Sequence, residues 1–75
     1  MTTDRADFLA LAILSKLWDS SSEDLTSTDS ETLHDVADGF LDHVDLFIGW
    51  GCSDAVILTA LDSATRVKDM AIAAA

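Results

Sequence analysis

The sequence predicts an all-α fold, a small three-helix unit that consists of an antiparallel helical hairpin and an apolar N-terminal helix. The 75-residue chain contains no proline and three glycines, so few residues interrupt a helix. Over most of its length hydrophobic side chains recur at three- and four-residue steps, the period of an amphipathic helix. Hydrophobic residues make up 49% of the chain, which is enough to form a core despite the high charge.

The chain is expected to form one domain over residues 1–75, near the lower size limit for a core that is stable on its own. Such chains usually gain stability from disulfides, a metal or self-association. Cys52 is the only cysteine, and no cysteine–histidine cluster has the spacing of a zinc site. We therefore expect a homodimer without metal or cofactor, in the cytoplasm. The apolar stretch 8–18 is too short to span a membrane, which requires about 20 residues.

The first helix is expected over residues 4–18, after a cap at Thr2 or Thr3. Its apolar side chains point almost all the way round: Phe8, Leu9, Leu11, Ile13, Leu14, Leu17 and Trp18. A helix that is apolar on every side must be covered on every side, which two other helices cannot do in so small a domain. We expect it to lie at a two-fold dimer interface or to bind a foreign partner. The candidate contact residues are Phe8, Leu11, Leu14, Trp18 and Trp50.

Residues 19–28 lack periodicity and are rich in serine and threonine, so they are predicted to form a connector. The second helix follows over residues 29–48 and starts with a capping box of Thr28 and Glu31. Gly49 is placed to end it in a left-handed conformation. Its apolar side chains form one continuous stripe: Leu33, Val36, Ala37, Phe40, Leu41, Val44, Phe47 and Ile48.

The third helix is expected over residues 53–73, with Ser53 as its cap. Its apolar face is wide and partly lined by alanine: Val56, Ile57, Ala60, Leu61, Ala64, Val67, Ala71 and Ile72. Alanines allow two helices to approach closely. The short turn at residues 49–52 should therefore make the second and third helices an antiparallel hairpin.

The net charge of −10 is unevenly distributed, because no lysine or arginine occurs between Lys16 and Arg66. So negative a surface repels nucleic acids and anionic membranes, and it favours basic protein surfaces. Direct binding of nucleic acid or of a membrane is therefore not expected. The simplest alternative is that the acidity serves solubility or adaptation to salt.

Five carboxylates fall on the side of the second helix opposite its apolar stripe, within an arc of about 80°. They are Glu31, Asp35, Asp38, Asp42 and Asp45. Like charges three or four residues apart destabilise a helix, so selection for stability alone would more often interleave lysine or arginine. A regular row of negative charges also imitates a phosphate backbone. The row predicts a nucleic-acid mimic or another docking face for a basic protein surface.

These features favour a non-catalytic protein-binding module, such as a small inhibitor, anti-activator or adaptor that occupies a site on a larger protein. Small acidic helical proteins of this kind are frequent in phages and mobile elements, an analogy of type only. Salt separates the two modes of docking, because charge-driven binding weakens at high salt and apolar binding changes little.

No side chains with the pattern of a catalytic site are readable, so we expect no enzyme. His34 and His43 flank the apolar stripe on opposite edges and cannot share a metal within one helix. Cys52 is expected to be an unreactive turn residue, because the neighbouring Asp54 raises the pKa of its thiol.

The pair Asp29-Ser30 opens the acidic second helix, and in this respect, as in size, acidity and helicity, the chain resembles an acyl carrier protein. In that family the serine of an Asp-Ser-Leu motif carries phosphopantetheine. The resemblance implies attachment at Ser30. Here Glu31 stands in place of the motif's leucine, and no glycine precedes Asp29.

Overall fold

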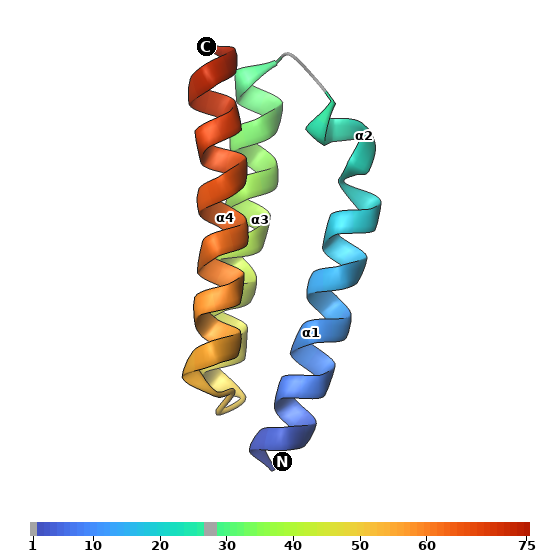
Figure 1. Cartoon of the computed structure of the whole chain (residues 1–75), viewed down its shortest axis with the longest axis vertical. Helices are drawn as coiled ribbons and strands as arrows, with labels where there is room; N and C mark the ends of the chain where they lie inside the picture. Colours follow the sequence, from blue (N-terminus) through green and yellow to red (C-terminus); the bar gives the residue numbers. More distant parts are fainter. Residues whose placement is uncertain (1, 27–28) are drawn as a thin grey trace.

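The computed structural model describes residues 2–26 and 29–75, which form four α-helices and no strand (Figure 1). The helices are α1 (Thr3–Ser20), α2 (Ser22–Leu25), α3 (Ser30–Gly49) and α4 (Asp54–Ala74). The predicted all-α character is therefore confirmed. The molecule measures 41 × 18 × 15 Å, because its three long helices lie lengthwise. None of the described helices combines the length and the apolar character needed to cross a membrane.

α3 and α4 pack closely as an antiparallel pair, joined by a short turn (Figure 1). α3 contributes three large, fully buried side chains: Leu33, Phe40 and Phe47. α4 faces them mainly with small ones, including Ala60, Ala64 and Ala71. Large residues opposite small ones allow close packing. Full burial of one Leu or Phe side chain is worth about 1.5–3 kcal/mol, so this interface is the main source of stability.

The turn between α3 and α4 differs from the prediction, which places the left-handed residue at Gly49. Gly49 is the last residue of α3, and the positive φ of 76° belongs to Gly51. The N–H of Gly51 donates to the carbonyl of Ile48, and the N–H of Cys52 donates to that of Phe47, each at 3.1 Å. These two bonds form a Schellman motif, whose left-handed residue stands two positions after the last helical one. Glycine adopts this conformation readily because it has no Cβ.

The start of α3 also differs from the predicted capping box of Thr28 and Glu31. Thr28 lies outside the described residues, and the cap is Asp29. One carboxylate oxygen of Asp29 accepts a hydrogen bond from the N–H of Glu31 at 3.0 Å, and the other accepts one from the hydroxyl of Thr32 at 2.8 Å. The carboxylate therefore satisfies a backbone donor that the helix itself leaves free.

The predicted connector over residues 19–28 is partly helical. α1 continues to Ser20, whose hydroxyl donates to the carbonyl of Lys16 at 2.7 Å. The single turn of α2 follows, and the half-buried Leu25 packs against the core. This tertiary contact explains why a segment of polar composition is helical.

α1 lies alongside the hairpin, antiparallel to α3 (Figure 1). Its buried side chains are Ala6, Ala10 and Leu14, which follow one another at four-residue steps on one side of the helix. The opposite side stays uncovered in the chain, where Phe8 is 72% exposed and Leu11 is 49% exposed. The hairpin thus covers one side of a helix whose sequence is apolar all round.

Two polar contacts attach α1 to the hairpin near its two ends. At one end a carboxylate oxygen of Asp7 accepts a hydrogen bond from the N–H of Ser53 at 2.8 Å. Ser53 is also the N-cap of α4, as predicted. Near the other end the indole N–H of Trp18 donates to the hydroxyl of Ser63 at 3.3 Å.

Candidate protein-binding surface

The acidic face consists of Glu31, Asp35, Asp38, Asp42 and Asp45. All five side chains are exposed on the outer side of α3. The opposite side of the helix is held in the core by its large apolar residues. The packing of α3 therefore fixes the direction in which the five carboxylates point.

None of the described residues forms an ion pair with the acidic face. In residues 2–26 and 29–75 the one ion pair joins Arg66 to Asp62 at 3.0 Å, and both belong to α4. An exposed pair of this type contributes about 0.3–0.5 kcal/mol. The charge of α3 is thus left to solvent or to a partner.

The spacing of the acidic face can be compared with that of a nucleic acid strand. From Glu31 to Asp45 the helix rises about 21 Å at 1.5 Å per residue, so successive carboxylates lie about 5 Å apart along the axis. Phosphates of one DNA strand follow at about 3.4 Å along the duplex axis. The carboxylates of the acidic face therefore follow one another along a straight helix at a somewhat wider spacing than the phosphates of one DNA strand.

The predicted apolar contact residues do not form one surface. Phe8 and Leu11 are exposed on α1, but Leu14 is buried in the core, which removes it as a contact residue in the folded chain. Trp50 is half-buried, and its ring packs on that of Phe47 with centroids 5.7 Å apart. It therefore covers the end of its own hairpin.

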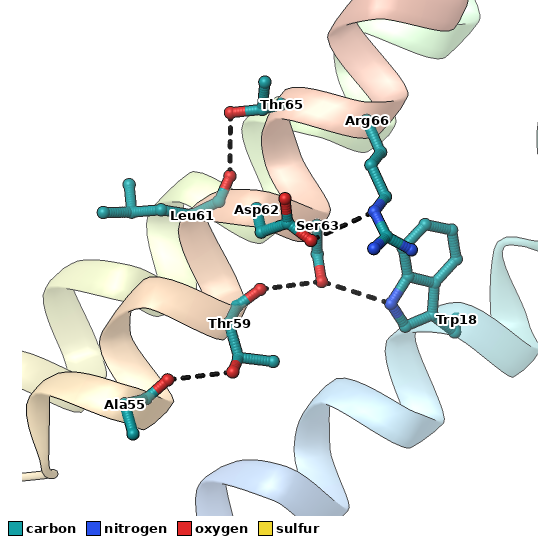
Figure 2. Close-up of polar contacts among 8 residues, drawn as sticks. All are labelled: Trp18, Ala55, Thr59, Leu61, Asp62, Ser63, Thr65 and Arg66. Atoms are coloured by element: carbon teal, nitrogen blue, oxygen red, sulfur yellow. Dashed lines mark hydrogen bonds and ion pairs between the residues drawn. The ribbon is translucent and has the colours of Figure 1, made fainter.

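Trp18 is also partly used inside the chain. Its ring lies 5.0 Å from that of Phe40, between centroids, and its indole N–H reaches Ser63 (Figure 2). The Ser63 hydroxyl donates in turn to the carbonyl of Thr59 at 3.0 Å, within α4. Ser63 is thus a buried hydroxyl with both a donor and an acceptor contact. In the sequence, only the position of Ser63 among the apolar side chains of α4 indicates that its hydroxyl is buried.

The histidines lie apart, as their positions on the helix imply. His34 is exposed, whereas His43 is half-buried with its Nδ1 2.8 Å from the carbonyl oxygen of Gly39. Because a carbonyl oxygen only accepts, this contact requires the proton on Nδ1. In the described part of the chain no three histidine, cysteine, aspartate or glutamate side chains are grouped to hold a metal.

Cys52 is half-buried in the turn before α4. Burial raises the pKa of its thiol, and the negative charge of Asp7 raises it further. From the sequence, Asp54 is the predicted source of the negative charge that raises this pKa. The structure places Asp7 there instead, since α1 docks against the turn.

Ser30 is the first residue of α3 and is half-buried. The preceding Asp29 caps the helix, and its hydrogen bonds from Thr32 and Glu31 hold the pKa of its carboxyl below the ordinary value. Asp29 therefore has a local structural role as the cap of the helix.

α4 exposes an apolar strip that its sequence pattern does not predict. The pattern places Leu61 and Ile72 on the packing face of the helix, but both are exposed, together with Leu58. The face that α4 buries is narrower and centres on its alanines, because α3 approaches there. Ile48, which was predicted to belong to the apolar stripe of α3, is likewise exposed.

No pocket is found among the described residues, so the candidate sites are convex surfaces. No protein-family model, curated protein or solved structure matches the chain. The geometry and charge of these surfaces are therefore the basis for a functional proposal.

Proposed function

We propose that this chain is a non-catalytic protein-binding module whose acidic face occupies a basic site on a larger protein. The three long helices form the unit that presents this face. The observation that carries the proposal is the row of five exposed carboxylates on α3, none of which forms an ion pair with any residue that the structure describes. A groove that normally grips the phosphates of a nucleic acid has the complementary charge, and the chain would then act as an inhibitor or anti-activator by mimicry.

The acidic face destabilises α3, which favours a functional role for its carboxylates. Neighbouring carboxylates such as Asp38 and Asp42 stand four residues apart, and each such pair destabilises the helix by about 0.2–0.5 kcal/mol. The buried side chains of α3 are worth several times more, so the fold tolerates the repulsion. Arginine on a partner would convert the repulsion into charge-assisted hydrogen bonds, each worth about 1.5–3 kcal/mol.

The proposal is tested by capturing binding proteins from the native cell, identifying them by mass spectrometry and measuring the affinity of each purified partner. We expect the affinity to fall at least ten-fold between about 50 and 200 mM salt. Duplex DNA should compete for the same site. The variant with Asp35→Asn, Asp38→Asn and Asp42→Asn should lose binding.

A matched control removes the same charge elsewhere on the surface. Asp4→Asn, Asp19→Asn and Asp24→Asn change three exposed carboxylates of α1 and α2, and this variant should bind normally. Equal loss in both variants, or full binding by the α3 variant, would exclude the acidic face as the binding site.

A second candidate is an interaction protein, itself a homodimer, that binds its partner through apolar helix surface. The exposure of Phe8 and Leu11 on α1 favours it. Binding of this kind should change little with salt and should be lost in the Phe8→Asp variant, whereas the Asn variant of α3 should bind as the wild type does.

A further inference from the structure

We infer that α1 is a lid that undocks from the hairpin as a unit, while α3 and α4 stay packed against each other. The three long helices are buried to different extents. α1 buries three of its 18 residues, whereas α3 buries five of 20 and α4 buries six of 21. Regions of a protein with few buried apolar side chains open at the lowest free energy. α1 is therefore the helix expected to open first.

The interface between α1 and the hairpin consists mainly of small side chains. Ala6 and Ala10 are fully buried, and Leu14 is the one large side chain that α1 buries. Trp18 packs against the core but is only half-buried. α3, by contrast, buries three large side chains completely against the alanines of α4. Because the free energy of burial grows with the apolar area removed from water, the interface between α3 and α4 is the stronger of the two.

Undocking leaves neither polar contact of α1 without a substitute. When Trp18 moves away, the Ser63 hydroxyl still donates to the carbonyl of Thr59 at 3.0 Å. The carboxylate of Asp7 and the N–H of Ser53 become accessible to water, which replaces their mutual hydrogen bond. The two contacts therefore orient α1 on the hairpin and contribute little to the free energy that holds it there.

The hinge of this movement is Ser21, the residue between α1 and α2. Its φ of −91° and ψ of 0° lie between the helical and the extended regions, and the serines on both sides of it have a modest helix propensity. α2 itself stays attached, because Leu25 packs against the core. The hinge lies at the end of the molecule opposite the α3–α4 turn, so the N-terminal end of α1 moves furthest (Figure 1).

Opening changes which apolar side chains α1 presents to solvent. Phe8 and Leu11 are exposed in the docked state, and Leu14 and Trp18 join them when α1 undocks. At 100° per residue these four positions fall within an arc of about 120°, so the open helix carries one continuous apolar stripe. The acidic face lies on α3 and does not change, so the inference does not depend on the proposed function.

The test places a thiol at one of two buried alanines of the full chain, in a Cys52→Ser background. Ala10→Cys puts the thiol between α1 and the hairpin, and Ala64→Cys puts it between α3 and α4, where the alanines are 0% and 1% exposed. The thiol on α1 should react with a thiol reagent roughly 100-fold faster. Its rate should also depend less on urea, because undocking exposes less surface than unfolding does. Equal rates with equal urea dependence would overturn the inference, since α1 and the hairpin would then open together.

Substitution of Asp7 tests the same movement from the other end of the helix. Asp7→Ala should speed the reaction of the Ala10→Cys thiol about five-fold and leave that of the Ala64→Cys thiol unchanged. The matched variant Asp4→Ala removes an exposed carboxylate from the first turn of α1 and should change neither rate. Equal acceleration at both thiols, or none at either, would overturn the inference.

Hydrogen exchange of the unaltered chain gives a readout without any substitution. The backbone amides of α1 should exchange with deuterated solvent faster than those of α3 and α4, because a short helix without tertiary packing is marginal in water. The same exchange free energy in all three helices would contradict a separate opening of α1.

Discussion

The outer faces of α3 and α4 belong to the same hairpin, but they are built in opposite ways. The outer face of α3 carries five exposed carboxylates and no lysine or arginine. That of α4 mixes both charge signs and exposes large apolar side chains such as Leu58 and Ile72. The inner faces complement each other, large residues against small. The comparison shows that packing decides the inner faces, whereas the outer faces are free to differ and therefore carry the information about partners.

The largest effect on the free energy of unfolding is expected from a substitution in the interior, which holds both outer faces in place. Phe40→Ala removes a fully buried ring of α3 that also contacts Trp18, and it should lower the free energy of unfolding by about 3–5 kcal/mol. A chain of this size has about 4–11 kcal/mol in total, so the variant should be largely unfolded on mild heating. Thermal unfolding followed by circular dichroism measures this.

The matched control for this prediction is Ile48→Ala on the same helix. Ile48 is exposed, so the loss should stay within about 0.5 kcal/mol. Equal losses at Phe40 and Ile48 would contradict the separation of inner and outer faces.

A substitution on the acidic face should change the free energy of unfolding by a smaller amount and in the opposite direction. Asp38→Lys places a positive charge between Asp35 and Asp42, so two repulsive pairs become attractive ones. The free energy of unfolding should rise by about 1 kcal/mol at low salt. Chemical denaturation measures the gain, which should largely vanish near 1 M salt, where the screening length is about 3 Å. The same variant should bind a basic partner less tightly, and a gain that persists at high salt would show that repulsion is not its cause.

The smallest effect concerns the cap of α3. The pKa of Asp29 is lowered in the folded chain, so its charged form stabilises the fold at pH above the ordinary pKa, and this contribution is lost as pH falls through the lowered value. Asp29→Asn keeps a capping side chain without the titration. The difference in stability between wild type and variant, measured between about pH 5 and pH 2, should therefore shift in favour of the variant as pH falls. A difference that is constant with pH would mean that Asp29 does not titrate with folding.

The sequence predicts those features of the hairpin that depend on residues close together in the chain. The periodicity of α3 places Phe40 inside and Asp38 outside, because both positions follow from the turn of a single helix. The cap at Ser53 follows from its place before an apolar run. The left-handed glycine was harder to predict, since Gly49 and Gly51 both flank Trp50 and only the hydrogen bonds of the turn distinguish them.

The acidic face was therefore determined by the sequence alone, whereas the exposed strip of α4 and the docking of α1 were decided by the tertiary structure. An apolar residue such as Leu58 or Phe8 is exposed or buried according to which helix packs beside it, and local periodicity does not contain that information. The contacts of Trp18 with Ser63 and of Asp7 with Ser53 join residues 45 and 46 positions apart. Such pairs meet only when the whole chain folds, because no local pattern brings them together.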